Sequence, residues 1–479
     1  MDSDLCQGRQ SDFWKRRCGR FRKLVHHRSR DVVQGNTMQQ ALVLEKRRKM
    51  FTADGGHRSL NPEDLLQQCA HLVGPSRIVE KVECQPRDPC DLVHVCVAHP
   101  GAALRSALYG TRRAFRAPCV GKGMTNAQAR ASAIGEAVER FSWIFRGDEV
   151  RIRSSHKELC NKAIHPNTCM NFSARQYQER EKNNRREDQH NWVPHRFDEQ
   201  QEIEWTQIWS LTQEQFKYIA TAYCYFGYPP CEEHDFCRSD SNGNATGANF
   251  EEAILQGFLE LVERDSVALW WYNRARRPGV DLESFGEPYF SALEDLYRVL
   301  GRDMVVLDIT SDFTIPVFVA LSTSRKVKEN LIFGFGAHLE PRLAILRALT
   351  EMNQSLVQVI TGKSPRLFVG KLLEREFLEP DPSAAMRTCR DYLRLDSEDL
   401  REDVLTCVGL ARKLGMETLV LDLTRPDGGM LVVKVIVPGL RPWWARFAPG
   451  RLYDVPLKMG WRVVPPLLEQ RLNPSHLSV

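Results

Sequence analysis

The sequence predicts an α/β fold in which mixed sheets pack against long helices. Two long and largely apolar stretches, residues 126–145 and 249–273, have the composition of buried helices. Short runs rich in β-branched and aromatic residues, such as 304–310 and 316–322, stand between helical stretches. Because helices and sheets must bury their apolar faces against each other, this alternation indicates an α/β or α+β domain.

The first expected element is a short helix at residues 61–73. Asn61 can cap this helix, and Pro62 suits its first turn, where a backbone N–H is not needed. The run "DLVHVCVA" at 91–98 follows and predicts a buried strand. We therefore expect organised structure to begin with the helix at 61–73.

The first long helix is expected at 126–145, with Thr125 or Asn126 as its cap. Residues 174–202 are polar and mixed in charge, which predicts a solvated excursion outside the core. The other expected elements, in chain order, are a strand pair at 202–211 and 216–226, a long helix at 249–273, strands at 304–310, 316–322 and 331–337, a helix at 341–360, and a closing helix, strand and strand at 403–416, 418–424 and 430–437.

Residues 1–56 are expected to form a basic and poorly ordered N-terminal extension of a domain that occupies residues 57–479. The segment "FWKRRCGRFRKLVHHRSR" at 13–30 is strongly basic, whereas the rest of the chain is nearly balanced. The formal net charge of +5 is small for 479 residues, so nucleic acid is not an expected partner. A nucleic-acid-binding or partner-binding arm at 13–30 is the alternative.

The N-terminus and the cysteines indicate the compartment. The chain begins "MDSDLCQG" without the features of a signal peptide, and no apolar run approaches the roughly 18 residues of a membrane helix. Its 14 cysteines are scattered without a dense framework. We therefore expect a cytoplasmic protein with reduced thiols and no membrane partner.

One acidic pattern occurs twice, once in each long helix. The segments "SAIGEAVER" (132–140) and "QGFLELVER" (256–264) place a polar residue, Glu, Glu and Arg at the same spacing. Positions i, i+4, i+7 and i+8 lie on one side of an α-helix, because each residue turns it by about 100°. The first acidic stripe is Ser132, Glu136, Glu139 and Arg140, and the second is Gln256, Glu260, Glu263 and Arg264.

The stripes have two interpretations. Each can be a solvated helix face with a Glu-to-Arg pair at i, i+4, which contributes only about 0.2–0.5 kcal/mol. Alternatively, the stripes face each other, and carboxylates that meet away from water require cations or protons. Mg²⁺ prefers such oxygen ligands together with phosphate oxygens. Two matched stripes on helices this apolar favour a Mg²⁺–phosphate site shared by both helices.

The usual nucleotide-binding motifs are absent. The segment "VGKGMT" at 120–125 contains the Gly-Lys of a P-loop without the loop that precedes it. The segment "GFGAHL" at 334–339 does not complete a G-x-G-x-x-G. We therefore expect a nucleotide site with no P-loop and no Rossmann fingerprint.

Four segments together resemble the YcaO superfamily, in particular the branch that forms azoline rings in thiazole/oxazole-modified peptides. They are "GKGMTNAQARASAIGEAVERFS" (121–142), "DSNGNATGANFEEAILQGFLELVERDSVALWWYNR" (240–274), "GFGAHLEPRLAILRALTEMNQ" (334–354) and "FAPGRLYDVPLKMGW" (447–461). The resemblance extends from roughly residue 57 to the C-terminus. It implies an ATP-binding YcaO-type fold.

The resemblance also implies which residues bind ATP and Mg²⁺. The implied metal ligands are Glu136, Glu139, Glu260 and Glu263. The implied nucleotide-binding residues are Ser132, Arg140, Glu252, Gln256, Arg264 and Arg347, with Lys122 and Ser76 as weaker candidates. The implied catalytic residues are Glu136, Glu263 and Arg347. The arginines would neutralise phosphate charge, because a guanidinium offers a fork of donors to phosphate.

The reaction that the resemblance implies is an ATP-dependent cyclodehydration of a precursor peptide. A Cys thiol, or a Ser or Thr hydroxyl, attacks the preceding backbone carbonyl, and the carbonyl oxygen is then phosphorylated. Phosphate leaves as a thiazoline or oxazoline ring forms. Such chemistry depends on positioning and electrostatic stabilisation more than on covalent work by the protein.

The chain departs from the family pattern in two places. Ala248 stands where the family often has an Asn near the metal site, although Asn249 follows it. Azoline-forming members usually end in Pro-x-Pro-x-Pro, whereas this chain ends "RLNPSHLSV", with no proline after Pro474. Two alternatives therefore stay open. One is a non-catalytic scaffold that binds nucleotide or peptide, and the other is thioamide or amidine formation.

The expected partners are the precursor peptide and a separate E1-like protein that binds the peptide's leader. Azoline-forming members work with such a module, and the basic extension at 1–56 is too short to be one. A homodimer is left open.

Overall fold

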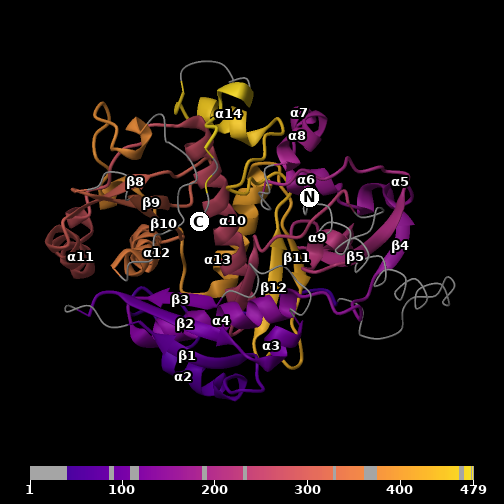
Figure 1. The fold of residues 1–479 in the computed structure, drawn as a ribbon, viewed down its shortest axis with the longest axis horizontal. Helices are drawn as coiled ribbons and strands as arrows, with labels where there is room; N and C mark the ends of the chain where they lie inside the picture. Colours follow the sequence, from indigo (N-terminus) through magenta and orange to yellow (C-terminus); the bar gives the residue numbers. More distant parts are fainter. Residues whose placement is uncertain are drawn as a thin grey trace, which may run out of the picture.

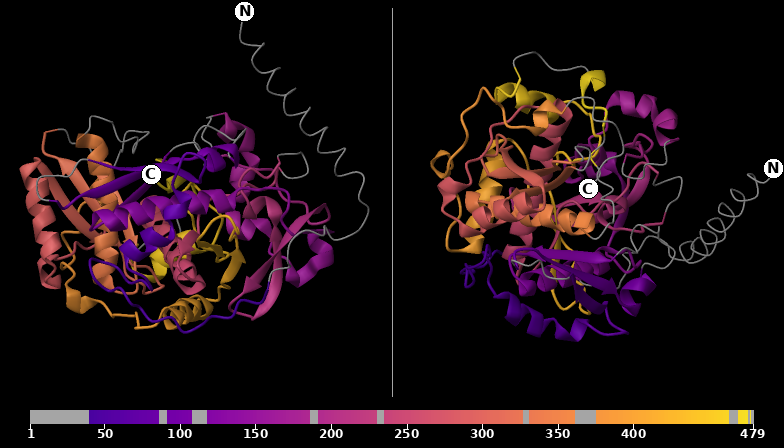
Figure 2. Two further views of the ribbon diagram at one scale, coloured as in Figure 1. Left: turned by 90° about the horizontal axis from the view of Figure 1, so that it is seen from below. Right: turned by 60° about the vertical axis from the view of Figure 1, so that its left-hand side comes forward.

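The computed structural model describes residues 40–85, 91–107, 118–185, 191–229, 235–326, 331–360, 375–462, 469–475 and 477. Three sheets and their helices are arranged about the central helix α10 (Phe250–Asn273) (Figure 1). In both views of Figure 2, the orange unit with β8–β10 and the magenta and yellow sheet with β5 and β11 lie on opposite sides of the molecule. Sheets packed against long helices are therefore confirmed. The basic segment 13–30 lies outside the described residues.

The first sheet is three-stranded, in the order β1-β2-β3, and helix α4 (Asn126–Trp143) packs on it. Thr125 caps α4 by accepting a hydrogen bond from the N–H of Gln128, as one of the two expected caps. A side chain at Gly121 would collide with the backbone of Ala129 and Ala133, so this glycine lets strand and helix approach closely. The strands are β1 (Val79–Cys84), β2 (His94–Pro100) and β3 (Cys119–Gly123), and the small helices nearby are α2 (Pro62–Gln68), capped by Asn61, and α3 (Ala102–Ala107).

The second sheet is six-stranded, in the order β4-β5-β11-β12-β7, with β6 also paired to β5. The central helix α10 packs against β7 and β12. Asn249 caps α10, and a side chain at Gly257 would collide with the backbone oxygen of Gly243. The strands are β4 (Ile152–Ser155), β5 (Glu202–Ser210), β6 (Gln215–Ala220), β7 (Asn244–Gly247), β11 (Leu419–Asp422) and β12 (Leu431–Ile436).

The third sheet has the order β10-β9-β8, and helix α12 (Pro341–Ile360) lies across β10 and β9. Gly334 and Gly336 face the backbone of α12 with no room for a side chain. The glycines of "GFGA" therefore serve this close packing. The other elements here are β8 (Arg302–Asp308), β9 (Val317–Ser324), β10 (Leu331–Ala337) and α11 (Pro288–Val299). In all three sheets, each described strand pair is antiparallel.

The prediction that residues 174–202 form a solvated excursion is wrong for the first third of this segment. Residues 174–184 form helices α7 (Ala174–Gln178) and α8 (Arg180–Asn184), and Ser173 caps the first of them. Gln176 is buried, where it donates to the backbone oxygen of Ala445 and accepts from the N–H of Phe447. A polar composition thus conceals a helix that is held by polar contacts rather than by an apolar face. The remaining helices are α5 (His156–Leu159), α6 (Pro166–Met170), α9 (Thr221–Cys224), α13 (Leu400–Lys413) and α14 (Arg451–Lys458).

Residues 40–59, which we call the N-terminal strap, pack on the body of the molecule. The backbone oxygen of Arg47 accepts from Leu400, and the N–H of Lys49 donates to the backbone oxygen of Glu398. The N–H of Glu45 donates to the side chain of Glu251 at 2.6 Å. Although residues 40–56 were assigned to the extension, these contacts make them part of the folded body.

Cys84 of β1 and Cys96 of β2 form a disulfide across a paired position of the two strands. The expectation of reduced thiols throughout is therefore wrong at this pair. Only the register of the two strands brings these cysteines together, and the register cannot be read from the spacing of cysteines in the sequence.

The described residues at the C-terminal end are held against α10. The N–H of Asn473 donates to the backbone oxygen of Tyr272 at 2.9 Å, and the indole of Trp271 donates to the backbone oxygen of Ser475 at 2.7 Å. Leu477 is buried in the core. The tail is thus anchored without a Pro-x-Pro-x-Pro motif. Across the described ranges, no helix is both long enough and apolar enough to cross a membrane.

Candidate active site

The first acidic stripe lies on α4, beside strand β3. Glu136 accepts a hydrogen bond from the N–H of Val120 at 2.7 Å and pairs with Arg140 at 2.5 Å. Glu139 lies one turn further along and has no hydrogen-bond partner among the described residues. Ser132, one turn before Glu136, is exposed. The structure thus fixes one carboxylate of the stripe and leaves the other available to a ligand.

The second acidic stripe lies on α10 and repeats this arrangement. Glu260 accepts from the N–H of Gly243 at 3.3 Å and pairs with Arg264 at 2.8 Å. Glu263 is again without a hydrogen-bond partner in the described part of the chain. In each stripe, therefore, the first Glu is held by a backbone N–H and by the Arg of the same stripe, and the second Glu is not.

The carboxylates of the two stripes crowd each other. Burial raises the pKa of Glu139 well above its ordinary value, and the carboxylates of Glu260 and Glu136 raise it further. Burial also raises the pKa of Glu260. Burial and the nearby carboxylate of Glu351 raise the pKa of Glu263 to about 7. Carboxylates shift one another in this way only at short range. This crowding argues against two separate solvated faces.

A third helix, α12, contributes to the same region. Its Glu351 forms an ion pair with Lys122 of β3, and its Arg347 donates to the amide oxygen of Gln256 at 2.7 Å. The structure therefore brings Lys122, Gln256 and Arg347 together with the stripes. Glu351 was not among the expected residues. The available signal was an Arg-x-x-x-Glu spacing on a buried helix, which places Arg347 and Glu351 on one side.

Arg347 lies close to a second guanidinium. Burial and the positive charge of Arg58 lower the pKa of Arg347 to about 9, against the opposing effect of Glu263. Two neighbouring arginines in a partly buried place repel each other unless an anion lies between them. Phosphate is such an anion, and its oxygens match the donors of a guanidinium.

The strap completes the region near the start of α10. Arg58 pairs with Glu252 at 3.3 Å, and Ser59 donates to Glu252 from its N–H at 3.2 Å and from its hydroxyl at 2.9 Å. Asn249, the cap of α10, accepts from the N–H of Glu252 and donates to the Ser59 hydroxyl at 2.8 Å. Arg58 and Ser59 were not predicted, because their partner is more than 190 residues away. Asn249 supplies an amide at this end of the site, next to Ala248.

Arg264 has donor capacity to spare. Its guanidinium lies over the ring of Trp443, with its carbon 3.1 Å from the ring centroid. Its Nε is buried and has no hydrogen-bond partner in the structure described. A buried N–H without a partner is costly, and a phosphate oxygen would satisfy it. Ser76, in contrast, is exposed in the loop before β1, and no described contact joins it to the stripes.

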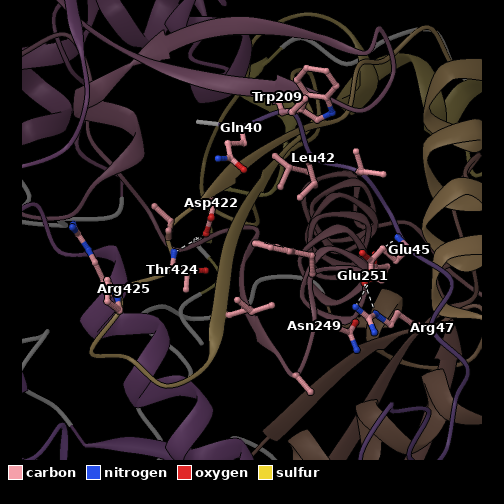
Figure 3. A pocket seen from close by; sticks show the side chains of 18 of the residues that line it. Gln40, Leu42, Glu45, Arg47, Trp209, Asn249, Glu251, Asp422, Thr424 and Arg425 are labelled. Atoms are coloured by element: carbon pink, nitrogen blue, oxygen red, sulfur yellow. Dashed lines mark hydrogen bonds and ion pairs between the residues drawn. The ribbon is translucent and has the colours of Figure 1, made fainter. Parts of the chain in front are cut away.

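A hollow of about 1100 Å³ lies beside the start of α10 (Figure 3). The strap lines one side with Gln40 and Leu42, and the second sheet contributes Trp209 and Asp422. The hollow reaches Asn249 but does not include the acidic stripes. It adjoins the end of the site that contains Ser59.

The residues present fit a magnesium ion with a nucleotide phosphate. Carboxylate oxygens are the protein ligands that Mg²⁺ prefers, and the crowding described above is relieved by a cation or by protons. The cations around the acids, most of them paired with a carboxylate of the site, are of the kind that binds phosphate oxygens. The carboxylates are those of Glu136, Glu139, Glu260, Glu263 and Glu351, and the cations are those of Arg58, Lys122, Arg140, Arg264 and Arg347.

Known proteins resemble this chain in sequence and in fold. A family model described as YcaO cyclodehydratase, ATP- and Mg²⁺-binding, matches residues 120–441. A heterocyclase in complex with substrate and cofactor is 48% identical over 91% of this chain and 59% of its own, with a TM-score of 0.84. The heterocyclase TruD is 46% identical over 92% of this chain and 56% of its own, with a TM-score of 0.75. This chain thus spans less than two thirds of either heterocyclase.

A third solved structure shares the fold at lower identity. It is YcaO from Methanopyrus kandleri, bound with AMPPCP and Mg²⁺. It is 22% identical, covers 84% of this chain and 100% of its own, and has a TM-score of 0.62.

Proposed function

Because this chain belongs to the YcaO cyclodehydratase family, we propose that it catalyses the ATP- and Mg²⁺-dependent cyclodehydration of a ribosomally made precursor peptide. The products are thiazoline rings from Cys residues or oxazoline rings from Ser and Thr residues. One observation carries the proposal. Among the described residues, Glu139 and Glu263, from two different helices, face other carboxylates without hydrogen-bond partners of their own, and the buried Nε of Arg264 has no partner there either.

In the proposed reaction, the chain's residues position the groups and compensate their charge. A thiol or hydroxyl of the peptide adds to the preceding carbonyl carbon, and the carbonyl oxygen becomes the leaving group. Bound Mg²⁺-ATP supplies the phosphoryl group that lets this oxygen depart as phosphate. The nucleophile loses its proton, the amide nitrogen loses its own, and a C=N bond closes the ring. The net change in the peptide is the loss of one water per ring.

We assign the metal to Glu136, Glu139, Glu260 and Glu263, and we add Glu351. Arg347 and Arg264 neutralise the phosphates, because both are partly buried and keep N–H groups for a phosphate. Arg347 donates to the amide oxygen of Gln256 and to the backbone oxygen of Ala337, which leaves other N–H groups of its guanidinium, and the buried Nε of Arg264 has no partner among the described residues. Arg58 and Lys122 act in the same sense, and Arg140 steadies Glu136. Glu252 and Gln256 hold Arg58 and Arg347 respectively. Ser132 is exposed at the start of its stripe, so we assign it to the edge of the site, and we do not assign Ser76 to the site.

The peptide and its delivery complete the proposal. The heterocyclase with the highest TM-score above was solved with substrate and cofactor, and both heterocyclases are much longer than this chain. We propose that a separate E1-like protein binds the leader of the precursor and presents the peptide to this chain. We place the reaction in the cytoplasm, because it consumes ATP.

The test begins with nucleotide binding, since this needs neither partner nor peptide. The full chain is titrated calorimetrically with ATP, with and without Mg²⁺, as wild type, Glu263→Gln and Glu402→Gln. Glu402 is a control, because it is exposed on α13 beside Arg401. We expect tight Mg²⁺-dependent binding by the wild type and the control, and binding weaker by about 100-fold or more in Glu263→Gln. Equal binding by all three proteins would overturn the assignment.

The reaction is tested next, with a candidate precursor and its leader-binding protein. Mass spectrometry should show loss of water from the peptide in step with release of phosphate. Turnover that requires added sulfide would instead indicate thioamide formation. Nucleotide binding without turnover in the presence of partner and peptide would favour the non-catalytic scaffold.

A further inference from the structure

The N-terminal strap has two ends that contact the same turn of α10. At one end, the N–H of Glu45 donates to Glu251, and Arg47 lies 3.8 Å from the same carboxylate (Figure 3). At the other end, Ser59 donates twice to Glu252. The strap therefore holds two adjacent carboxylates in the first turn of the helix that carries the second acidic stripe.

Between these ends, the strap is fixed by a buried lysine. The side chain of Lys49 is 2% exposed, and its ammonium lies 2.7 Å from Asp403, which is 0% exposed. The ammonium also lies 3.4 Å from Asp396 and donates to the backbone oxygen of Ser397 at 2.6 Å. Removing one partner of a buried ion pair is strongly destabilising, because the other charge is left uncompensated. Lys49 thus attaches the strap to α13 and to the segment before it.

His57 continues the same network toward the nucleotide site. Its Nε2 lies 3.2 Å from Glu340 and its Nδ1 lies 3.5 Å from Asp396, while Lys49 is 3.4 Å from the same Nδ1. His57, Glu340 and Asp396 have potential metal-ligand atoms within 4.8 Å of one another. However, each ring nitrogen faces a different carboxylate, and the ammonium occupies the space beside one of them. The group is therefore an ionic network that anchors the strap.

The residue after His57 is Arg58. The anchored network and the nucleotide site are thus joined by one peptide bond, so the fixed position of His57 keeps the backbone of Arg58 and Ser59 close to Glu252. Arg58 also lies close enough to Arg347 to lower its pKa, so its position matters to the charge of the site.

We propose that Lys49 is a positioning residue for the nucleotide site. Its buried pairing with Asp403 holds the strap down, so that Arg58 and Ser59 face Glu252 and the phosphates. Seating of the strap and binding of nucleotide then stabilise each other, because coupling between two sites is reciprocal. The proposal rests on the ATP-dependent function above.

The test compares Lys49→Met with Arg48→Met. Met is unbranched and only one atom shorter than Lys, and it removes the charge. Arg48 is a matched control, because it is the neighbouring residue and its side chain is 77% exposed. The two readouts are the Kd for Mg²⁺-ATP and hydrogen exchange of the amides in residues 45–59. We expect Lys49→Met to raise the Kd about 10-fold and to speed exchange in the strap, and Arg48→Met to change neither.

A rescue variant separates positioning from general damage. In Lys49→Met with Asp403→Asn, the uncompensated buried charge is removed, and the amide oxygen of Asn can still accept from the N–H and the hydroxyl of Ser397. We expect this double variant to recover slow exchange and most of the ATP affinity. Faster strap exchange with an unchanged Kd in Lys49→Met would overturn the proposal, and so would a Lys49→Met strap that exchanges as slowly as the wild type.

The wild type provides a test that needs no variant to fold. Saturating Mg²⁺-ATP should slow amide exchange in residues 45–59 more than in α11, which contributes no residue to the site. Binding of ATP without protection of the strap would overturn the role of Lys49. Absence of ATP binding in the wild type would instead contradict the proposed function itself.

Discussion

The two acidic stripes repeat one spacing on two helices, but they have different neighbours. The hydrogen bonds described for Glu136 stay within β3 and α4, and this stripe begins at the exposed Ser132. The second stripe begins at Gln256, which binds Arg347 of α12. It ends at Arg264, which lies over Trp443 near the end of the chain.

The comparison shows that a shared pattern does not imply a shared sensitivity. The second glutamate of each stripe, Glu139 or Glu263, has the same place in the pattern and no hydrogen-bond partner among the described residues. Substitutions of these two residues should therefore have equal effects. The first positions of the stripes have unequal surroundings, so substitutions there should differ. The following predictions test these two halves of the comparison.

The largest effect is expected at the two second glutamates. Glu139→Gln and Glu263→Gln should each weaken Mg²⁺-ATP binding by about 100-fold or more, because each removes a proposed charged ligand of the metal. Calorimetric titration of the two variants side by side measures this. A large loss in one variant and none in the other would mean that only one stripe binds the metal.

A smaller effect is expected at Glu351, the carboxylate of the third helix. Glu351→Gln should weaken Mg²⁺-ATP binding by about 10-fold, since it removes the partner of Lys122 and a neighbour of Glu263. The same titration, with Glu402→Gln as the exposed control, checks it. A loss as large as that of Glu263→Gln would mean that Glu351 contributes as much to metal binding as Glu263 does.

Substitutions at the first positions of the two stripes, Gln256 and Ser132, should have clearly different effects on ATP binding. Gln256→Ala frees Arg347 from its hydrogen bond and should raise the Kd or KM for ATP by about 5-fold. Ser132→Ala changes an exposed hydroxyl and should have an effect of less than about 2-fold. Calorimetric titrations of both variants with Mg²⁺-ATP measure this difference. Equal losses in both variants would remove the asymmetry that the structure indicates.

The smallest effect is a dependence of stability on pH. The pKa of Glu263 is raised from 4.5 to about 7 in the folded chain, so its stabilising contribution is present below the lower value and lost as pH rises through about 7. Without metal, the Tm should therefore fall by a few degrees between about pH 5.5 and pH 8.

The control for the pH dependence is Glu263→Gln, which should show a shallower fall in Tm over the same range. Mg²⁺-ATP requires the ionised carboxylate, so it should raise the Tm of the wild type more at about pH 8 than at about pH 6. An equal rise at both pH values would mean that Glu263 does not bind the metal.

Much of this architecture follows from local signals in the sequence. The helices that carry the site were expected from their apolar length, and the caps Thr125 and Asn61 follow from side chains that accept a hydrogen bond from a backbone N–H. The two stripes follow from helical spacing alone. These features depend on residues at most a few positions apart.

The remaining features depend on residues far apart in the chain. Lys122 meets Glu351 across 229 positions, and Arg58 meets Glu252 across 194. The disulfide depends on strand register, and α7 is held by polar contacts to residues about 270 positions away. No local period or cap reports such contacts, so they become visible only once the layers are packed.

The carboxylates of the site come from three separate layers, and this has a consequence for folding and unfolding. Helix α4 packs on the first sheet, α10 on the second and α12 on the third. A molecule in which one layer has not yet docked contains every side chain of the proposed site but lacks the site itself. On the proposed function, incompletely folded chains would therefore not hydrolyse ATP, and a bound nucleotide would stabilise the three layers together against unfolding.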